Sequence, residues 1–142
     1  MTLIELIVAI TIVMVLASMA MPVARFAVRR QKERELRRDL YEMRDAIDKY
    51  KDATDRGLIK IKLGTEGWPP DLDTLVRGED VNGKKVRFLR KIPVDPMTGN
   101  SDWGVRSTSD DPDSDSSNGE NLFDVYSKSE QTAMNGTKYK EW

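Results

Sequence analysis

Residues 1–26 read MTLIELIVAITIVMVLASMAMPVARF, and this stretch decides how the rest of the chain can be arranged. Between Leu3 and Ala24 the only ionisable side chain is that of Glu5. About 20 apolar residues, at about 1.5 Å rise per residue, cross the ~30 Å hydrocarbon core of a bilayer, so the stretch predicts a transmembrane helix. A cleaved secretory signal is the alternative, but such a signal starts with basic residues and none precedes this apolar run.

Glu5 has two interpretations that the residues alone leave open. A carboxylate in the first turn of a helix is favoured by the helix dipole by roughly 0.3–1 kcal/mol. An ionised acid at the centre of a membrane helix costs about 2.5–3.5 kcal/mol and less near the end, so acids there are candidates for function. In the second interpretation Glu5 pairs with a positive group of a neighbouring chain, and the nearest candidate is the α-amino group of residue 1.

The stretch MTLIELIVAITIVMVLASMAMP resembles the mature N-terminus of type IV pilins and of the pseudopilins of type II secretion systems. That pattern is an aromatic residue, then Thr-Leu-Ile-Glu, then an apolar helix with a proline near its end. The matching residues are Thr2, Leu3, Ile4, Glu5 and Pro22. Met1 stands where the family usually has Phe, and is either the mature first residue or an initiator.

The resemblance implies a life cycle for the chain. A prepilin peptidase would remove a short basic leader just before Met1, whose new amino group would be N-methylated. Subunits would wait in the inner membrane with the C-terminal domain in the periplasm. Assembly machinery and minor pilin-like subunits would then lift them into a helical homopolymer, in which Glu5 pairs with the residue 1 amine of an adjacent subunit.

The orientation in the membrane rests on this resemblance. Basic residues follow the apolar run, and the positive-inside rule taken alone would place them in the cytoplasm. A basic leader, now removed, would offset that bias. The basic residues are Arg25, Arg29, Arg30, Lys32, Arg34, Arg37 and Arg38.

Residues 25–55 predict an amphipathic continuation of the same helix. Its apolar stripe repeats at spacings of four and three, and is expected to pack on a small antiparallel sheet. A helix from Thr2 to Asp55 would be about 80 Å long, so its apolar half, residues 1–24, is expected to protrude. Pro22 should kink or locally break it, and the resemblance supports local melting around Met14–Pro22 in the filament. The stripe consists of Leu36, Leu40, Met43, Ile47 and Tyr50.

Residues 56–142 predict a small globular domain, which makes the whole chain α+β and type IV pilin-like. The alternation in Gly57–Leu63 indicates a short strand or an extended loop. Asp71 can cap a short helix after Pro69–Pro70, and Asn82-Gly83 is a turn signal. Val86, Phe88 and Leu89 are expected to be buried. With strands in 103–108 and 122–128, one antiparallel sheet of three or four strands is predicted.

Three runs in this half also resemble the major pseudopilin: WPPDLDTLV, FLRKIPVDP and LFDVYS. Together with the N-terminus they extend the resemblance over most of the chain. The residues of the second run are interpreted as structural, shaping the turn that leads to the sheet. They are Lys91, Ile92, Pro93, Asp95 and Pro96.

Residues 108–121 read TSDDPDSDSSNGEN and predict a solvated loop. Its oxygens could in principle hold calcium, but their spacing differs from the EF-hand pattern. Major pseudopilins often use aspartates after the last strand for calcium, and the corresponding run here has Glu130 and Glu141 but no Asp. No cofactor is therefore expected, with Ca²⁺ as the open alternative.

The composition argues against enzymes and nucleic-acid binding. The chain has no Cys and no His, which removes thiolate chemistry, the usual general base and the commonest transition-metal ligand. A net charge of −1 gives no general attraction to nucleic acid. An aromatic path for electron transport through Phe26, Tyr41 and Tyr50 is conceivable, but packing is the favoured interpretation.

The favoured function is that of a structural pseudopilus subunit that assembles through its N-terminal helix and drives protein secretion across the outer membrane. A true type IV pilin for adhesion, motility or DNA uptake is the first alternative. Many such pilins carry a disulfide loop, which a chain without Cys cannot form. A membrane-anchored binding or enzymatic domain is the second alternative, and it would need a pocket with convergent polar groups.

Overall fold

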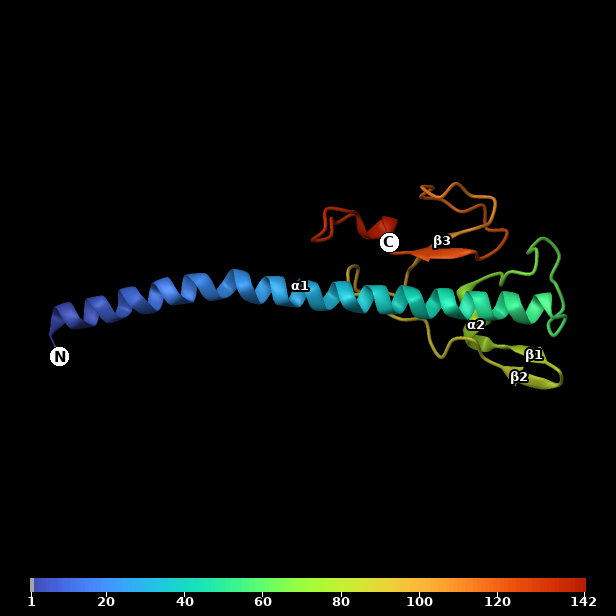
Figure 1. The fold of residues 1–142 in the computed structure, drawn as a ribbon, viewed down its shortest axis with the longest axis horizontal. Helices are drawn as coiled ribbons and strands as arrows, with labels where there is room; N and C mark the ends of the chain where they lie inside the picture. Colours follow the sequence, from blue (N-terminus) through green and yellow to red (C-terminus); the bar gives the residue numbers. More distant parts are fainter. Residues whose placement is uncertain (1) are drawn as a thin grey trace. The chain divides into compact units, whose positions relative to one another are not determined.

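A computed structural model describes residues 2–142 and has an α+β fold (Figure 1). The chain divides into two compact units, Met1–Arg34 and Glu35–Trp142. A long helix, α1 (Leu3–Asp55), supplies all the helical residues of the first unit and the first helix of the second. The predicted long N-terminal helix is confirmed, and so is its end at Asp55.

Helix α1 ends where Gly57 takes a left-handed conformation, with φ of 72°. The Gly57 N–H donates to the Thr54 carbonyl and the Leu58 N–H to the Ala53 carbonyl, at 2.9 Å each. These bonds satisfy two of the four carbonyls that the end of a helix leaves without an intrahelical donor.

The amphipathic half of α1 provides the centre of the hydrophobic core. Its predicted stripe is confirmed, because all five side chains are at most 2% exposed: Leu36, Leu40, Met43, Ile47 and Tyr50. Tyr50 stacks edge-to-face on the half-buried Phe88 with ring centroids 5.4 Å apart. The stripe is therefore a packing surface, as its period of three and four residues predicts.

A short helix, α2 (Leu72–Arg77), packs in the second unit. Asp71 is its N-cap as predicted: the Asp71 Oδ1 accepts from the Thr74 N–H at 2.6 Å and from the Thr74 hydroxyl at 2.7 Å. After α2 the chain folds back on it, since the Phe88 and Leu89 N–H groups both donate to the Leu75 carbonyl. Leu75 and Leu89 are buried as a result.

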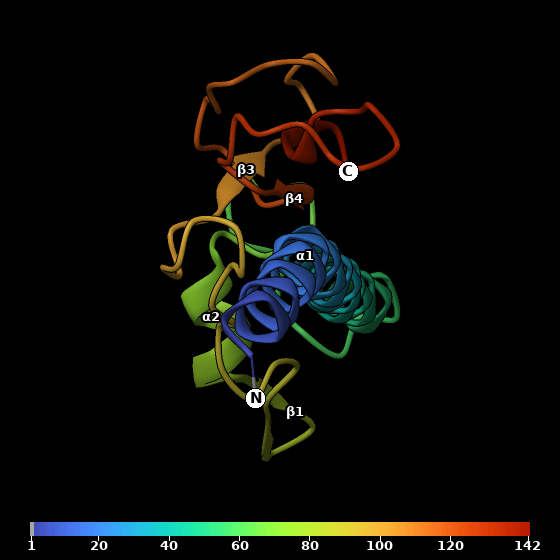
Figure 2. The same ribbon diagram turned by 90° about the vertical axis from the view of Figure 1, so that its left-hand side faces the viewer.

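The strands form two separate two-stranded antiparallel sheets, so the prediction of one sheet with three or four strands is wrong. Strand β1 (Glu79–Val81) pairs with β2 (Lys84–Val86), and β3 (Gly104–Arg106) pairs with β4 (Asp124–Tyr126). Within the second unit the two sheets lie on different sides of α1 (Figures 1 and 2). The helix stands between them, which prevents their edges from pairing.

The β1–β2 hairpin turns at Asn82-Gly83, as predicted, with φ values of 54° and 80°. Positive φ at both residues is what a type I′ hairpin turn requires. Val86, at the end of β2, is 37% exposed, so the prediction that Val86 is buried is wrong. Val81 of the partner strand packs against the core, whereas all three residues of β2 are exposed.

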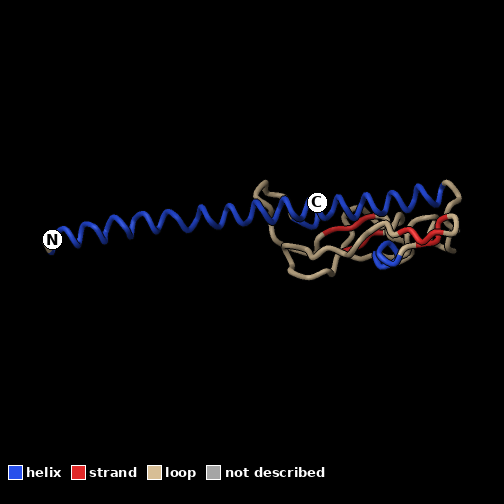
Figure 3. The backbone as a smooth tube through the Cα atoms, turned by 90° about the horizontal axis from the view of Figure 1, so that it is seen from below, coloured by secondary structure: helices blue, strands red, loops and turns tan. Residues whose placement is uncertain are grey.

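Gly57–Leu63 is a loop without strand pairing, which is the second of the two predicted conformations (Figure 3). Ile59 is buried, whereas Ile61 is 65% exposed and Leu63 is fully exposed. The strict alternation therefore does not mark one buried face. Leu58 and Ile59 contact the core, whereas the later apolar residues of the segment do not.

Candidate functional site

The apolar half of α1 is the first candidate site. Within residues 2–142, α1 is the one helix that is long and apolar enough, by length and composition, to cross a membrane. None of its most apolar 18-residue window is buried. Large apolar side chains are exposed all around it, from Leu3 (78%) and Ile4 (71%) to Val23 (68%). An apolar surface of this extent needs lipid or protein to cover it.

Glu5 lies in the first turn of α1 and takes part in a capping box with Thr2. The Thr2 N–H donates to the Glu5 carboxylate and the Glu5 N–H donates to the Thr2 hydroxyl oxygen, at 3.3 Å each. This reciprocal pair satisfies two N–H groups that the start of a helix leaves open. The T-x-x-E spacing in the sequence is the signature of this capping box. Met1 lies outside the described residues. Its predicted roles are pairing with Glu5 of an adjacent subunit, leader cleavage and N-methylation.

Two hydroxyl groups in the apolar segment are satisfied within the helix. The Thr11 hydroxyl donates to the Ile7 carbonyl and the Ser18 hydroxyl to the Val15 carbonyl, at 2.7 Å each. In hydrocarbon a polar group without a partner costs several kcal/mol, so these bonds suit a lipid environment.

Pro22 does not break α1. The helix is continuous from Leu3 to Asp55 with Pro22 inside it, so the expected local break is absent from this described segment. Proline removes one backbone donor, and the helical hydrogen bonds on either side maintain the conformation. Melting around Met14–Pro22 in a filament stays a prediction.

The KIPVDP run acts structurally, as predicted, through Asp95, whose side chain is fully buried. The Asp95 carboxylate accepts from the Ser127 hydroxyl at 2.6 Å and from the Met97 N–H at 2.7 Å. The Trp103 ring N–H donates to the Pro93 carbonyl at 2.9 Å. Asp95 thus joins the KIPVDP run to Ser127, at the end of the LFDVYS run.

An ion cluster around Asp124 went unnoticed in the sequence. The Arg44 Nε donates to the Asp124 Oδ1 at 2.7 Å, and the Arg44 Nη2 donates to the Trp142 carbonyl at 2.8 Å. Arg106 stacks over the Tyr126 ring with its guanidinium carbon 4.0 Å from the centroid, and its Nη1 lies 3.8 Å from the Asp124 Oδ2. Arg44 and Asp124 are 80 residues apart, so no local pattern could have paired them.

The ion cluster borders a cleft of about 610 Å³, which is also lined by Asp113, Asp115 and Lys140. The Lys140 Nζ lies 3.0 Å from the Asp115 carboxylate. Arg44 and Arg106 are therefore paired with Asp124, and Lys140 is paired with Asp115. In the described part of the chain, no group of three or more acidic side chains is placed to hold a metal ion.

The acidic loop 108–121 is organised by its own hydrogen bonds. The Asp110 carboxylate accepts from the Ser107 N–H at 2.7 Å and from the Asn118 N–H at 3.2 Å. These bonds, above all the one from Ser107, lower the pKa of the Asp110 carboxyl below its ordinary value. The Ser107 hydroxyl also contacts Asn118, so the loop closes on itself.

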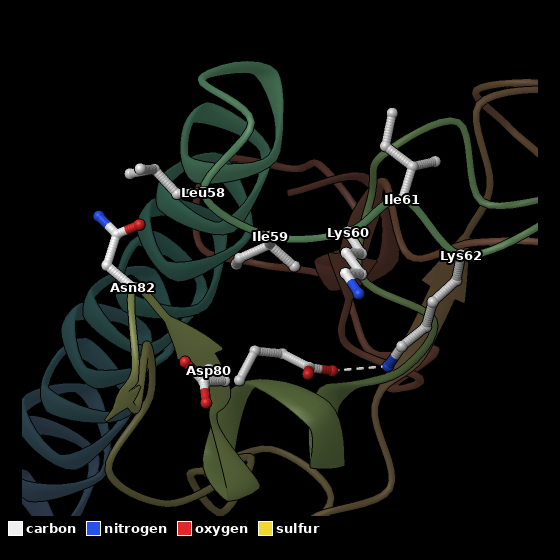
Figure 4. Close-up of a pocket in the computed structure, with 8 residues that line it drawn as sticks. Leu58, Ile59, Lys60, Ile61, Lys62, Asp80 and Asn82 are labelled. Carbon is white, nitrogen blue, oxygen red and sulfur yellow. Dashed lines mark hydrogen bonds and ion pairs between the residues drawn. The ribbon is translucent and has the colours of Figure 1, made fainter.

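A second hollow, of about 520 Å³, lies between the 58–62 loop and strand β1 (Figure 4). The Lys62 Nζ bonds to the Glu79 carboxylate at 2.6 Å, and Lys60 points in the opposite direction to Ile61. The Glu79 bond raises the pKa of Lys62. Lys62 and Glu79 are thus bonded to each other. The residues that line the hollow include no nucleophile–base pair.

No protein-family model matches this chain, and neither the curated proteins nor the solved structures contain a match.

Proposed function

We propose that this chain is a structural subunit of a type IV pilus-like filament, a pseudopilus, which assembles through the N-terminal helix and drives protein secretion across the outer membrane. The main observation that supports this proposal is that the apolar half of α1 is exposed on every side, while residues 35–142 have a core of their own. A segment of this kind needs a cover of lipid or protein. Lipid supplies it before assembly and sister helices supply it afterwards.

The pilin-like fold and the location belong to the same proposal. The exposed helix, the amphipathic continuation and the β3–β4 hairpin have the order expected of a pilin-like subunit. The Asp95–Ser127 bond supports the pseudopilin version, because it joins two runs that resemble the major pseudopilin. The chain is then a single-pass inner-membrane protein with its C-terminal domain in the periplasm, and later a periplasmic or extracellular filament.

Copies of the chain would associate by a head-to-tail interface that does not close on itself, which generates a helical filament. Prepilin peptidase, minor pilin-like subunits and inner-membrane machinery are the implied partners. Glu5 would leave its capping box with Thr2 and pair with the residue 1 amine of the next subunit. In a low-dielectric filament core such a pair is strongly attractive, while either charge alone is penalised, so it selects one offset between helices.

The test replaces Glu5 with Ala or Leu and measures membrane insertion and fibre assembly separately. We expect insertion to persist, because the apolar run is intact, and assembly to fail. Glu42→Ala is the matched control, since Glu42 is an exposed acid on the same helix outside the apolar half. Normal fibres from either Glu5 variant would refute the role of Glu5.

A second control separates pairing from capping. Thr2→Val removes the oxygen that accepts the Glu5 N–H and keeps the carboxylate, at a cost of about 1 kcal/mol in helix stability. If Glu5 acted only as a cap, Thr2→Val would abolish assembly as well. We expect Thr2→Val to assemble.

Secretion by a deletion strain, compared with electron microscopy of its surface fibres, then distinguishes a pseudopilin from a surface pilin.

A further inference from the structure

A hollow of about 330 Å³ lies on α1 where the apolar sequence gives way to the charged sequence. Pro22, Arg25, Phe26 and Arg29 line it. Spacings of three, four and seven residues place these side chains on one face of the helix. The Phe26 ring is 57% exposed, and both arginines are exposed. The hollow is therefore lined by two apolar side chains, which form its apolar floor, and by two arginine side chains.

The segment around this hollow is strongly basic. Residues 25–34 contain five basic side chains and one acid, Glu33, which gives a net charge of +4. The Glu33 carboxylate lies 3.8 Å from the Arg29 Nε. A guanidinium offers five donors and binds phosphate with two of them at once, so a ligand with a phosphate group can compete with Glu33 for Arg29.

The level of the hollow in a membrane follows from the length of the apolar run. Residues 3–24 extend about 33 Å along the helix, which fills the ~30 Å hydrocarbon layer. Arg25 and Arg29 then come within one or two turns of the layer's edge. Phospholipid phosphate groups lie at that depth, and the glycerol and the first methylene groups of the same lipid lie deeper, at the depth of Pro22.

We propose that this hollow binds the headgroup of an anionic phospholipid, with its phosphate between Arg25 and Arg29 and its glycerol backbone against Pro22 and Phe26. The proposal rests on the membrane residence that is part of the proposed function. A second copy of the chain is the other possible occupant, through its acidic loop 108–121. The lipid is favoured because the apolar floor is continuous with the membrane-spanning run, and a loop without apolar residues has nothing to place on that floor.

The test uses the full chain in phosphatidylcholine vesicles that contain spin-labelled phosphatidylglycerol or spin-labelled phosphatidylcholine. Electron paramagnetic resonance measures which labelled lipid is held at the protein surface. Each basic residue near an anionic surface changes binding by a factor of about five. We therefore expect about a fivefold preference for phosphatidylglycerol or more, and a preference lower by about fivefold or more in Arg25→Gln/Arg29→Gln.

Arg30→Gln/Arg34→Gln is the matched control, because it removes the same charge from the same segment outside the hollow. It should keep most of the preference. Glu33→Gln should increase the preference, since it removes the carboxylate that competes for Arg29. Equal losses in the two double variants would show a diffuse charge effect and overturn the site.

Further outcomes separate this proposal from the filament role. Abolition of the preference by millimolar glycerol phosphate would indicate a site for free phosphate and overturn the lipid. A preference that disappears as copies are crowded together at constant lipid composition would identify a second copy as the occupant.

Insertion without any lipid preference overturns the lipid site alone. Failure to insert into phosphatidylcholine overturns the lipid site together with membrane residence. A preference in a chain that forms no fibres leaves the lipid site standing and removes the filament role.

Discussion

Replacing Asp95 by Ala should destabilise the domain more than any exposed substitution in the same segment. Asp95 is fully buried, and its carboxylate accepts from the Ser127 hydroxyl and the Met97 N–H. Truncation to Ala leaves both donors without an acceptor. Since a buried donor that loses its partner costs about 1–3 kcal/mol, the expected loss is about 2–6 kcal/mol of unfolding free energy.

Stabilities of 5–15 kcal/mol are usual for domains, so this loss is a considerable fraction of the total unfolding free energy. For a domain of about 100 residues, each kcal/mol lowers the Tm by about 4 °C or more. Asp95→Ala should therefore lower the Tm by at least about 8 °C. Asp95→Asn keeps the shape and one accepting oxygen, and should cost less, about 1–3 kcal/mol.

The assay is urea unfolding of the full chain in detergent, followed by tryptophan fluorescence. Trp103 reports on this region, because its ring is 4% exposed and bonds to the Pro93 carbonyl. Asp102→Asn is the control: the Asp102 side chain is 69% exposed and its bond to Lys128 is a surface ion pair, worth about 0–1 kcal/mol. If Asp95→Ala cost no more than Asp102→Asn, the reasoning about buried acceptors would be refuted.

Two further substitutions test other parts of the fold. Gly104→Ala should cost about 1–3 kcal/mol or more in urea unfolding, because an added Cβ would lie 2.2 Å from the Tyr126 ring, and unchanged stability would contradict this packing. The pKa of Asp110 is lowered in the folded loop, so its hydrogen bonds contribute stability that is present above the ordinary value of 3.8 and is lost as the pH falls through the lower, folded pKa. Hydrogen exchange of the Ser107 and Asn118 amides should therefore lose protection in acid below pH 3.8, and Asp110→Asn should remove that dependence on pH.

The parts of the fold that the sequence predicted correctly are those set by neighbouring residues. A stripe at spacings of three and four residues, Asp71 before an apolar turn, and Asn82-Gly83 each depend on contacts within a few positions of the chain. Local hydrogen bonding and backbone geometry decide such features, so a short window of sequence contains the information.

The errors concern contacts between distant residues. Strands β3 and β4 lie in the segments predicted for them, whereas only the turn between β1 and β2 was predicted. The division into two sheets depends on the helix that stands between them. Ile61 and Leu63 alternate with polar residues as a strand would, yet no neighbouring segment covers them. Alternation reports which residues could share a face, and it does not report whether a second layer lies against that face.

Some features of the candidate site could be predicted from the sequence, and others could not. The apolar run and Glu5 are visible in composition alone, since an acid in an otherwise uncharged span of this length is unusual. The capping role of Glu5 needs only Thr2 three residues before it. In contrast, the Arg44–Asp124 bond joins residues 80 positions apart, and the chain contains 24 acidic residues from which a partner could be drawn.

Arg44 also bears on how a filament subunit could transmit force. In the second unit, the stripe from Leu36 to Tyr50 holds the domain against α1 through apolar contacts, which are not directional. Arg44 bonds to the Asp124 carboxylate at 2.7 Å and to the Val125 and Trp142 carbonyls at 3.1 and 2.8 Å. Charged hydrogen bonds depend steeply on distance and angle, so three of them on one side chain fix the axial position of strand β4 and of Trp142 on α1. If filament growth pushes on α1, this attachment is where the domain is made to move with its helix.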